Sequence, residues 1–195
     1  MKRVLLLVLS VFALPLFAED WPDGSWTLGA YALGELPVGA WSDTAKSVAG
    51  GGIRAEYGIS PGKAGFCASA EGAIEFPASD SEISRDFDFS LLAGIWARLF
   101  KIGRFSGIPS LWAGALSHIA GGEKNGFFVD LEFKAEFALR TQISGGLSID
   151  LAPFYIRAAE NNGKVLHGPG IRAGIVYNFG DWKYEIVEVP ATYQE

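Results

Sequence analysis

The chain has 195 residues, with 16 Lys+Arg against 22 Asp+Glu and a formal net charge of −6. This length fits one domain, and the acidic balance argues against nucleic-acid binding, which depends on neutralising phosphates. The single cysteine, Cys67, excludes an internal disulfide and a thiolate zinc cluster. The sequence is 49% hydrophobic and only 19% charged, with 25 glycines. It is too apolar for an ordinary soluble sandwich and too interrupted for a helical membrane protein, so it favours a barrel in lipid.

Residues 1–18 are predicted to be a secretory signal peptide. Lys2 and Arg3 precede an apolar stretch over residues 4–17, and the small residue Ala18 follows, which is the arrangement of such signals. The alternative is a membrane anchor, but the apolar run is short for a span of about 20 residues. Without residues 1–18 the charge is 14 − 22 = −8.

Eight β-strands are predicted in chain order. Their ranges are 25–35, 48–59, 65–76, 87–99, 108–120, 126–140, 143–156 and 168–179. The turns and loops between them are predicted at 36–47, 60–63, 77–86, 101–107, 121–125, 140–142 and 158–167. Pairing about the turn at 60–63 brings Arg54 roughly opposite Glu71, so we expect an ion pair between these two residues.

The clearest strand pattern lies in residues 126–140. Every second residue is apolar, in the order Phe127, Val129, Leu131, Phe133, Ala135, Phe137 and Leu139. The opposite face carries the charged residues Asp130, Glu132, Lys134, Glu136 and Arg140. Strict alternation is the period of a β-strand, so this segment is a strand with one apolar and one ionic face.

Eight strands joined as a meander predict an all-β fold, an eight-stranded antiparallel up-and-down transmembrane β-barrel over residues 19–179. The turns are shorter at one end, as in outer-membrane barrels, and an even strand number puts both termini at that periplasmic end. Residues 180–195 are predicted to be a periplasmic extension that follows the rim or adds a short strand. An aromatic girdle is predicted at this end from Trp21, Trp26, Phe100, Phe105, Trp182 and Tyr184.

The apolar faces are predicted to point outward into lipid. A soluble lipocalin-like barrel would turn them inward, but its charged exterior would carry many more Lys and Glu residues than this sequence offers. The residues predicted to line the lumen are Arg54, Glu56, Glu71, Glu75, Asp88, Arg98, Asp130, Glu132, Lys134, Glu136, Asp150 and Arg172. An eight-stranded barrel is narrow enough to be filled by its own side chains. The first interpretation is therefore a structural ion-pair network, and the second is the lining of a narrow, cation-leaning pore.

The last predicted strand carries Arg172, Gly174, Tyr177 and Phe179. This order, a polar residue, a glycine, an aromatic and a final Phe, resembles the signal that the outer-membrane barrel-assembly machinery recognises, although here residues 180–195 follow the Phe. With the predicted signal peptide and meander, the chain resembles the small eight-stranded outer-membrane barrels: the OmpA transmembrane domain, OmpX and OmpW-like proteins, including spirochaete versions. The resemblance covers roughly residues 25–179. It implies the outer membrane of a Gram-negative-type bacterium, with outer-membrane lipid and the assembly machinery as partners.

Some barrels of this fold are enzymes that use a histidine with a serine near the outer rim. His118 and His167 fall at predicted outer strand ends, but Ser117 and His118 are neighbours in a strand and point to opposite faces, so we interpret both histidines as rim residues. No catalytic residues, cofactor or metal-ligand spacing are predicted. The expected function is a structural barrel or a narrow OmpW-like pore for small solutes. The alternative is recognition of host ligands through loops 36–47, 77–86, 121–125 and 158–167.

Overall fold

A computed structural model describes residues 25–60, 63–78, 87–120, 126–159 and 165–179. The predicted signal peptide and the predicted extension at 180–195 lie outside these residues. The elements are β1 (Trp26–Glu35), η2 (Gly39–Trp41), β2 (Ala45–Ser60), β3 (Ala64–Pro77), β4 (Phe87–Ala97), β5 (Phe100–Ile102), β6 (Phe105–Ala120), β7 (Gly126–Ser144), β8 (Leu147–Ala159) and β9 (Val165–Asn178). No helix among the described residues is long and apolar enough to span a bilayer.

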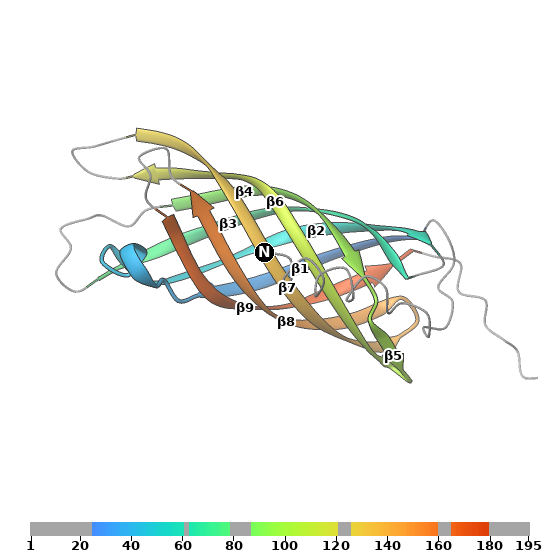
Figure 1. The fold of residues 1–195 in the computed structure, drawn as a ribbon. Coiled ribbons are helices and arrows are strands. Elements are labelled where there is room, and N and C mark those ends of the chain that lie inside the picture. The colour runs from blue at the N-terminus through green and yellow to red at the C-terminus, as the bar shows by residue number, and fades with distance from the viewer. Residues whose placement is uncertain (1–24, 61–62, 79–86, 121–125, 160–164, 180–195) are drawn as a thin grey trace, which may run out of the picture.

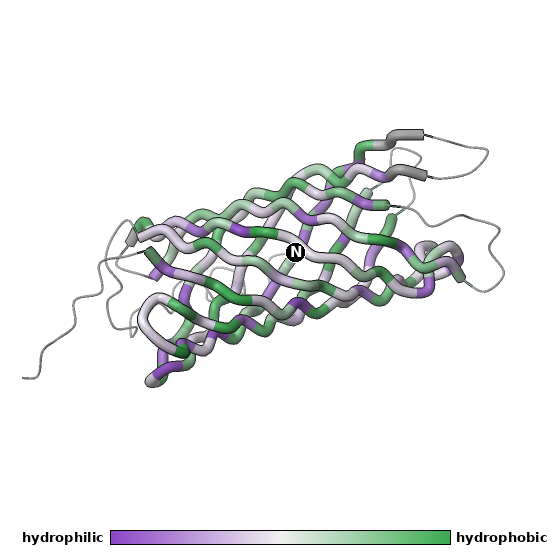
Figure 2. Tube along the Cα trace, turned by 180° about the vertical axis from the view of Figure 1, so that it is seen from behind, coloured by the Kyte–Doolittle hydropathy of each residue, from purple (hydrophilic) through white to green (hydrophobic). Residues whose placement is uncertain are grey.

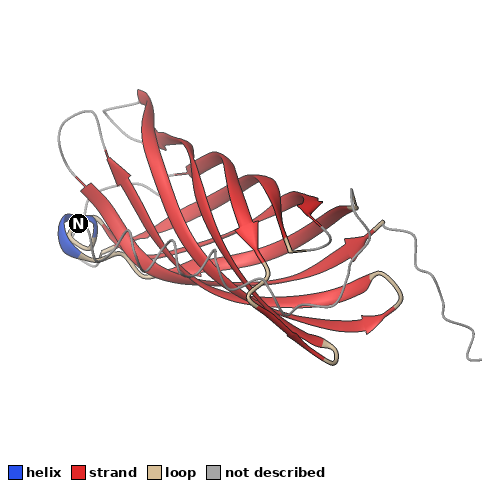
Figure 3. Ribbon diagram, turned by 45° about the vertical axis from the view of Figure 1, so that its right-hand side comes forward, coloured by secondary structure: helices blue, strands red, loops and turns tan. Residues whose placement is uncertain are grey.

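Eight long antiparallel strands form a closed barrel (Figures 1 and 3). Consecutive long strands pair with each other, β4 pairs with β6, and β9 pairs with β1 to close the sheet. The three-residue β5 pairs only with the start of β6. The prediction of an eight-stranded up-and-down barrel is therefore confirmed. We call the end where β1 begins and β9 ends the terminal end, and the opposite end, which carries η2, the loop end.

The barrel has an apolar outside and a polar inside. Along β7, Leu131 and Phe133 are 52% and 50% exposed, whereas Glu132 and Lys134 between them are 0% and 4% exposed. The outward-facing residues of the other strands are mostly apolar as well (Figure 2). The interior combines polar residues with apolar ones such as Leu33, Trp112 and Phe154. The prediction that the apolar faces point outward is confirmed, and this is the orientation that lipid favours.

One predicted turn is wrong, and a second is longer than the turn in the structure. The turn expected at 140–142 is part of β7, and the chain reverses between β7 and β8 at Gly145, whose φ of +47° favours glycine. The chain does turn within the predicted 101–107 segment, but the turn is shorter than expected, because β5 pairs with the start of β6 in a hairpin about Gly103, where φ is +58°. At the loop end β8 reaches Ala159 and β9 begins at Val165, so both ends of the predicted 158–167 loop are strand, and residues 160–164 lie outside the described residues.

An aromatic band surrounds the terminal end. Trp26 and Phe105 are 54% and 60% exposed, as the predicted girdle requires, and Phe100 is half-buried. Trp21, Trp182 and Tyr184 lie outside the described residues. The band also includes residues that the sequence analysis did not assign to it, namely Tyr57, Phe66, Tyr177 and Phe179. Trp26 packs against Tyr57 with ring centroids 4.9 Å apart, and Tyr177 meets Phe179 edge-on at 4.8 Å.

Candidate functional site in the barrel interior

The interior towards the terminal end is filled by three arginines and three carboxylates, which we call the arginine cluster. Its members are Arg54 and Glu56 on β2, Glu136 and Arg140 on β7, Asp150 on β8 and Arg172 on β9. Alternation along each strand turns these side chains inward. All six are 7% exposed or less, so the charges are removed from bulk water.

The arginine cluster is densely cross-linked. Arg140 donates from Nε and Nη2 to both oxygens of Asp150, at 2.7 and 2.9 Å, and from Nη1 and Nη2 to Glu56, at 2.9 and 3.0 Å. Arg172 donates from Nε and Nη2 to Glu136, at 2.7 Å each. Arg54 donates to Glu56 and to Glu136. Bidentate arginine–carboxylate pairs are strong and geometrically specific, so the cluster is charge-balanced and holds β2, β7, β8 and β9 together.

Apolar and aromatic side chains pack around the arginine cluster. The Trp112 ring packs against the Arg54 guanidinium, with 5.3 Å between the guanidinium carbon and the ring centroid. The Trp112 indole N–H donates to Ser110 Oγ at 2.8 Å. The Tyr31 ring packs against the Arg172 guanidinium in the same way, with 5.0 Å between the guanidinium carbon and the ring centroid. Arg98 is fully buried at the terminal end. The interior of this half is therefore occupied across its width by side chains.

The predicted Arg54–Glu71 ion pair is wrong. The β2–β3 register places Arg54 opposite Ser69, and Glu71 opposite Gly52. Arg54 reaches across the lumen to Glu136 on β7, and Glu71 pairs with Lys134, also on β7. Long side chains inside a narrow barrel meet partners on distant strands, so neighbouring-strand pairing did not predict them.

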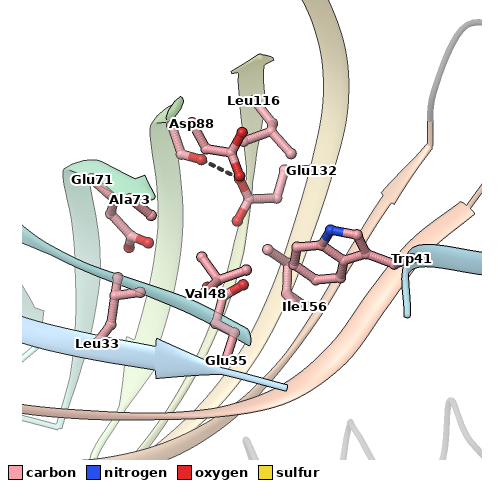
Figure 4. A pocket seen from close by; sticks show the side chains of 11 residues that line it. Leu33, Glu35, Trp41, Val48, Glu71, Ala73, Asp88, Leu116, Glu132 and Ile156 are labelled. Atoms are coloured by element: carbon pink, nitrogen blue, oxygen red, sulfur yellow. Dashed lines mark hydrogen bonds between the residues drawn. The ribbon is translucent and has the colours of Figure 1, made fainter. Parts of the chain in front are cut away.

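The middle of the interior contains more acids than bases, and we call it the acidic chamber. Glu35, Glu71 and Glu132 surround Lys134, whose ammonium pairs with Glu71 and lies 4.0 Å from Glu132 Oε1. Tyr31 donates to Glu71 at 2.7 Å, and Ser90 donates to Glu132 Oε2 at 2.6 Å. Figure 4 shows these carboxylates around a cavity of about 20 Å³, which is enough for one water molecule.

The loop end of the interior holds a second polar group, which we call the His118 cluster. His118 Nδ1 lies 2.6 Å from Asp88 Oδ1, and His118 Nε2 lies 3.5 Å from Asp130 Oδ2. Donor atoms of Glu75, Asp88 and His118 all lie within 4.8 Å of one another. The cluster comes together because β3, β4, β6 and β7 are consecutive in the sheet, with Asp88 directly opposite His118.

Trp41 covers this end of the interior. It lies in η2, between β1 and β2, and is only 3% exposed. Its indole N–H donates to Glu75 Oε1 at 2.7 Å, and its ring lines the acidic chamber (Figure 4). Gly39, with φ of +61°, permits the tight bend that starts η2. The β1–β2 loop thus folds back over the barrel opening.

All twelve residues predicted to line the lumen are buried, none more than 8% exposed. Sequence reasoning missed Arg140 as a lumen residue because its predicted turn began there, although the strand alternation continues through it. It also missed Glu35, at the inward-facing end of β1, and Trp41, for which the loop sequence gave no signal. His118 is turned into the barrel and is not a simple rim residue, whereas His167 is half-buried and its Nδ1 lies 2.7 Å from the hydroxyl of Tyr155.

The residues of the predicted assembly signal divide between the two faces of β9. Arg172 points inward into the arginine cluster, whereas Tyr177 and Phe179 are 46% and 57% exposed. A Cβ at Gly174 would lie 2.4 Å from the Ala30 carbonyl oxygen, so only glycine fits where β9 approaches β1.

No protein-family model and no curated protein matches the sequence. Solved structures do match the fold. The crystal structure of Neisserial surface protein A superposes with a TM-score of 0.65 at 13% identity, covering 80% of this chain and 100% of that one. Ail, the attachment invasion locus protein of Yersinia pestis, crystallised with the heparin analogue sucrose octasulfate, gives a TM-score of 0.55 at 16% identity over 81% of this chain and 100% of that one. The fold is that of the small eight-stranded outer-membrane barrels, as the sequence resemblance predicted.

Proposed function

We propose that this chain is an outer-membrane β-barrel protein that works as a closed structural barrel, without a continuous pore. The observation that carries this proposal is the arginine cluster, whose six buried side chains span the lumen between β2, β7, β8 and β9. A solute or ion moving along the barrel axis would have to separate these pairs. Breaking a buried ion pair costs about 3–5 kcal/mol, so passage without rearrangement is strongly opposed.

The loop-end half supports the same function. The acidic chamber has room for about one water molecule, and Trp41 covers it. The apolar exterior fits outer-membrane lipid as the surrounding medium, and the exposed Tyr177 and Phe179 fit recognition of β9 by the barrel-assembly machinery. A predicted signal peptide and a Gram-negative-type outer membrane complete this proposal. No catalysis is proposed, because Ser117 and His118 are sequence neighbours on opposite faces of β6.

Single-channel recording tests the closed barrel. Residues 19–195 would be refolded in detergent and inserted into a planar bilayer, with heat-unfolded protein as the control. We expect no discrete conductance steps from the wild-type protein. The double variant Glu56→Ser/Arg140→Ser removes a matched acid and base from the arginine cluster and is expected to conduct.

A matched control uses the exposed arginine Arg157, which lies outside the lumen. Arg157→Ser should leave the barrel silent. Discrete steps from the wild-type protein would contradict the closed barrel and favour the narrow, cation-leaning pore, in which case Lys134→Glu should change its selectivity.

Surface recognition through the loops is the second candidate function. It is favoured by the fold similarity to Ail, whose structure contains a heparin analogue. In this chain the loop end of the lumen is lined by Glu75, Asp88 and Asp130, so we expect a cationic or neutral partner and weak binding to sulfated glycans. Replacing residues 121–125 and 160–164 with Gly-Ser segments should abolish binding to such a partner and leave the conductance measurement unchanged.

A further inference from the structure

We propose that the His118 cluster is a binding site for a divalent first-row transition-metal ion such as Zn²⁺. The ligands are one imidazole nitrogen and two carboxylates, from His118, Asp88 and Glu75. Nitrogen and carboxylate oxygen are ligands that Zn²⁺ accepts, at about 2.0–2.2 Å. The proposal concerns the loop end of the lumen and does not depend on whether the barrel conducts.

The distances between the donor atoms fit a shared ion. Donors of Glu75, Asp88 and His118 lie within 4.8 Å of one another, whereas two ligands on one tetrahedral ion are roughly 3.4 Å apart, given the bond lengths of zinc sites. The three residues lie on the adjacent strands β3, β4 and β6. Rotations of their side chains are therefore enough to bring the donor atoms to the separations that one ion requires. His118 Nδ1 and Asp88 Oδ1 are already 2.6 Å apart, and a metal ion would replace the proton between them.

The groups around the three ligands orient them as metal sites require. His118 Nε2 is buried without a hydrogen-bond partner in the described part of the chain, and Asp130 Oδ2 lies 3.5 Å away as the carboxylate that a small ring rotation would bring into hydrogen-bond geometry. Metal-ligating histidines usually have such a partner, which fixes the tautomer and the ring orientation. Trp41 donates to Glu75 Oε1 at 2.7 Å and restrains the position of that side chain.

An independent observation shows that this half of the lumen has an excess of negative charge. Glu132 is 0% exposed, and its Oε1 is buried without a hydrogen-bond partner in the described part of the chain. It lines the same cavity as Asp88 (Figure 4). The described lumen residues of this half include six carboxylates, Glu35, Glu71, Glu75, Asp88, Asp130 and Glu132, against Lys134 and His118. A bound divalent cation would offset part of that excess.

Metal titration of the refolded barrel tests the site, and the chain supplies its own control because it has only two histidines. Zn²⁺ binding would be measured by calorimetry, and Co²⁺ binding by visible absorption. We expect one ion per chain for the wild-type protein and for His167→Gln, whose imidazole is at the same end but is half-buried and bonded to Tyr155. His118→Gln should weaken binding by more than tenfold, and Asp130→Asn by about 10–100-fold, the usual effect of losing a partner behind a ligand.

The folded state of each variant would be checked by its heat-dependent mobility in gels, and Asp88→Asn would replace His118→Gln if that variant did not fold. The absence of Zn²⁺ binding by the wild-type barrel would overturn the proposal. Equal Zn²⁺ affinities of the wild-type protein and His118→Gln would also overturn it. The same holds if His167→Gln lost as much Zn²⁺ affinity as His118→Gln.

Discussion

The two halves of the barrel interior contain similar residues but balance their charges differently. In the arginine cluster three arginines meet three carboxylates, and each arginine makes at least one hydrogen-bonded ion pair. In the acidic chamber the single ammonium of Lys134 faces three carboxylates. One half is closed by paired charges, and the other is closed by Trp41 above a water-sized cavity.

The comparison separates structural charges from charges that are available for binding. A buried ion pair with bidentate or multiple hydrogen bonds resists separation, so its members are committed to holding strands together, even though Arg54 Nε and Arg172 Nη1 are themselves buried without a hydrogen-bond partner in the described part of the chain. A buried carboxylate oxygen without a hydrogen-bond partner, such as Glu132 Oε1 with the Lys134 ammonium 4.0 Å away, costs stability until a closer cation or a proton compensates it. Removing a carboxylate charge should therefore destabilise the arginine cluster and relieve the acidic chamber, and substitutions in both halves test this difference.

The largest effect is expected from Arg140→Met. The variant leaves Glu56 and Asp150 buried without the four hydrogen bonds that Arg140 donates to them. Removing one partner of a buried pair costs about 3–5 kcal/mol. Reversible urea unfolding in lipid vesicles would measure the free energy of unfolding. If Arg140→Met lowered the free energy of unfolding no more than the exposed-site variant Arg157→Met does, the structural role of the arginine cluster would be contradicted.

Lys134→Met should have the next largest effect, about 3 kcal/mol, because it removes the only lysine among the described residues of the acidic chamber. Methionine keeps an aliphatic stem beside the Phe154 ring, which lies 4.9 Å from the ammonium. The same unfolding measurement on Lys134→Met/Glu71→Gln should recover part of the loss, since one unpaired carboxylate is then removed. If the double variant were less stable than the single one, excess negative charge would not be the cause.

The exterior of this barrel was predictable from the sequence because it depends on local information. Alternation with period two assigns Leu131 and Phe133 to lipid and Glu132 and Lys134 to the lumen without knowledge of any other strand. The turns were harder, because Gly145 and Gly103 act through a positive φ that hydrophobic alternation does not reveal. As a result the predicted turn at 140–142 removed Arg140 from the lumen.

Interior partners were not predictable in the same way. Arg54 and Glu136 are 82 residues apart in the chain and meet across the barrel, so their contact depends on the barrel's closure and on the register of every strand between them. The His118 cluster has the same origin, because its residues lie on separate strands with no short ligand motif. The position of Trp41 depends on how the β1–β2 loop folds back, and hydrophobic alternation in the strands does not predict the conformation of a loop.

Glu56→Gln should cost about 2 kcal/mol. The amide keeps the shape of the carboxylate but loses the charge that both Arg54 and Arg140 contact and presents an N–H₂ group to guanidinium donors, which leaves buried donors without partners. Urea unfolding would again measure the change, with Glu56→Asp as a variant that retains the charge. Glu56→Gln with unchanged stability would mean that packing, and not charge pairing, holds this half together.

Glu35→Gln is the opposite test in the other half, and its effect is the smallest. Glu35 is 6% exposed, and among the described residues its carboxylate has neither a hydrogen bond nor an ion pair. Replacing a buried carboxylate that has no hydrogen-bonded partner with a neutral amide of the same shape reduces the desolvation cost, so we expect a gain of about 1 kcal/mol in the free energy of unfolding at neutral pH. The gain should shrink when the unfolding is repeated at low pH, where the carboxylate is protonated in both states. A loss of stability at neutral pH would place Glu35 with the paired charges, and the contrast between the two halves would not extend to this residue.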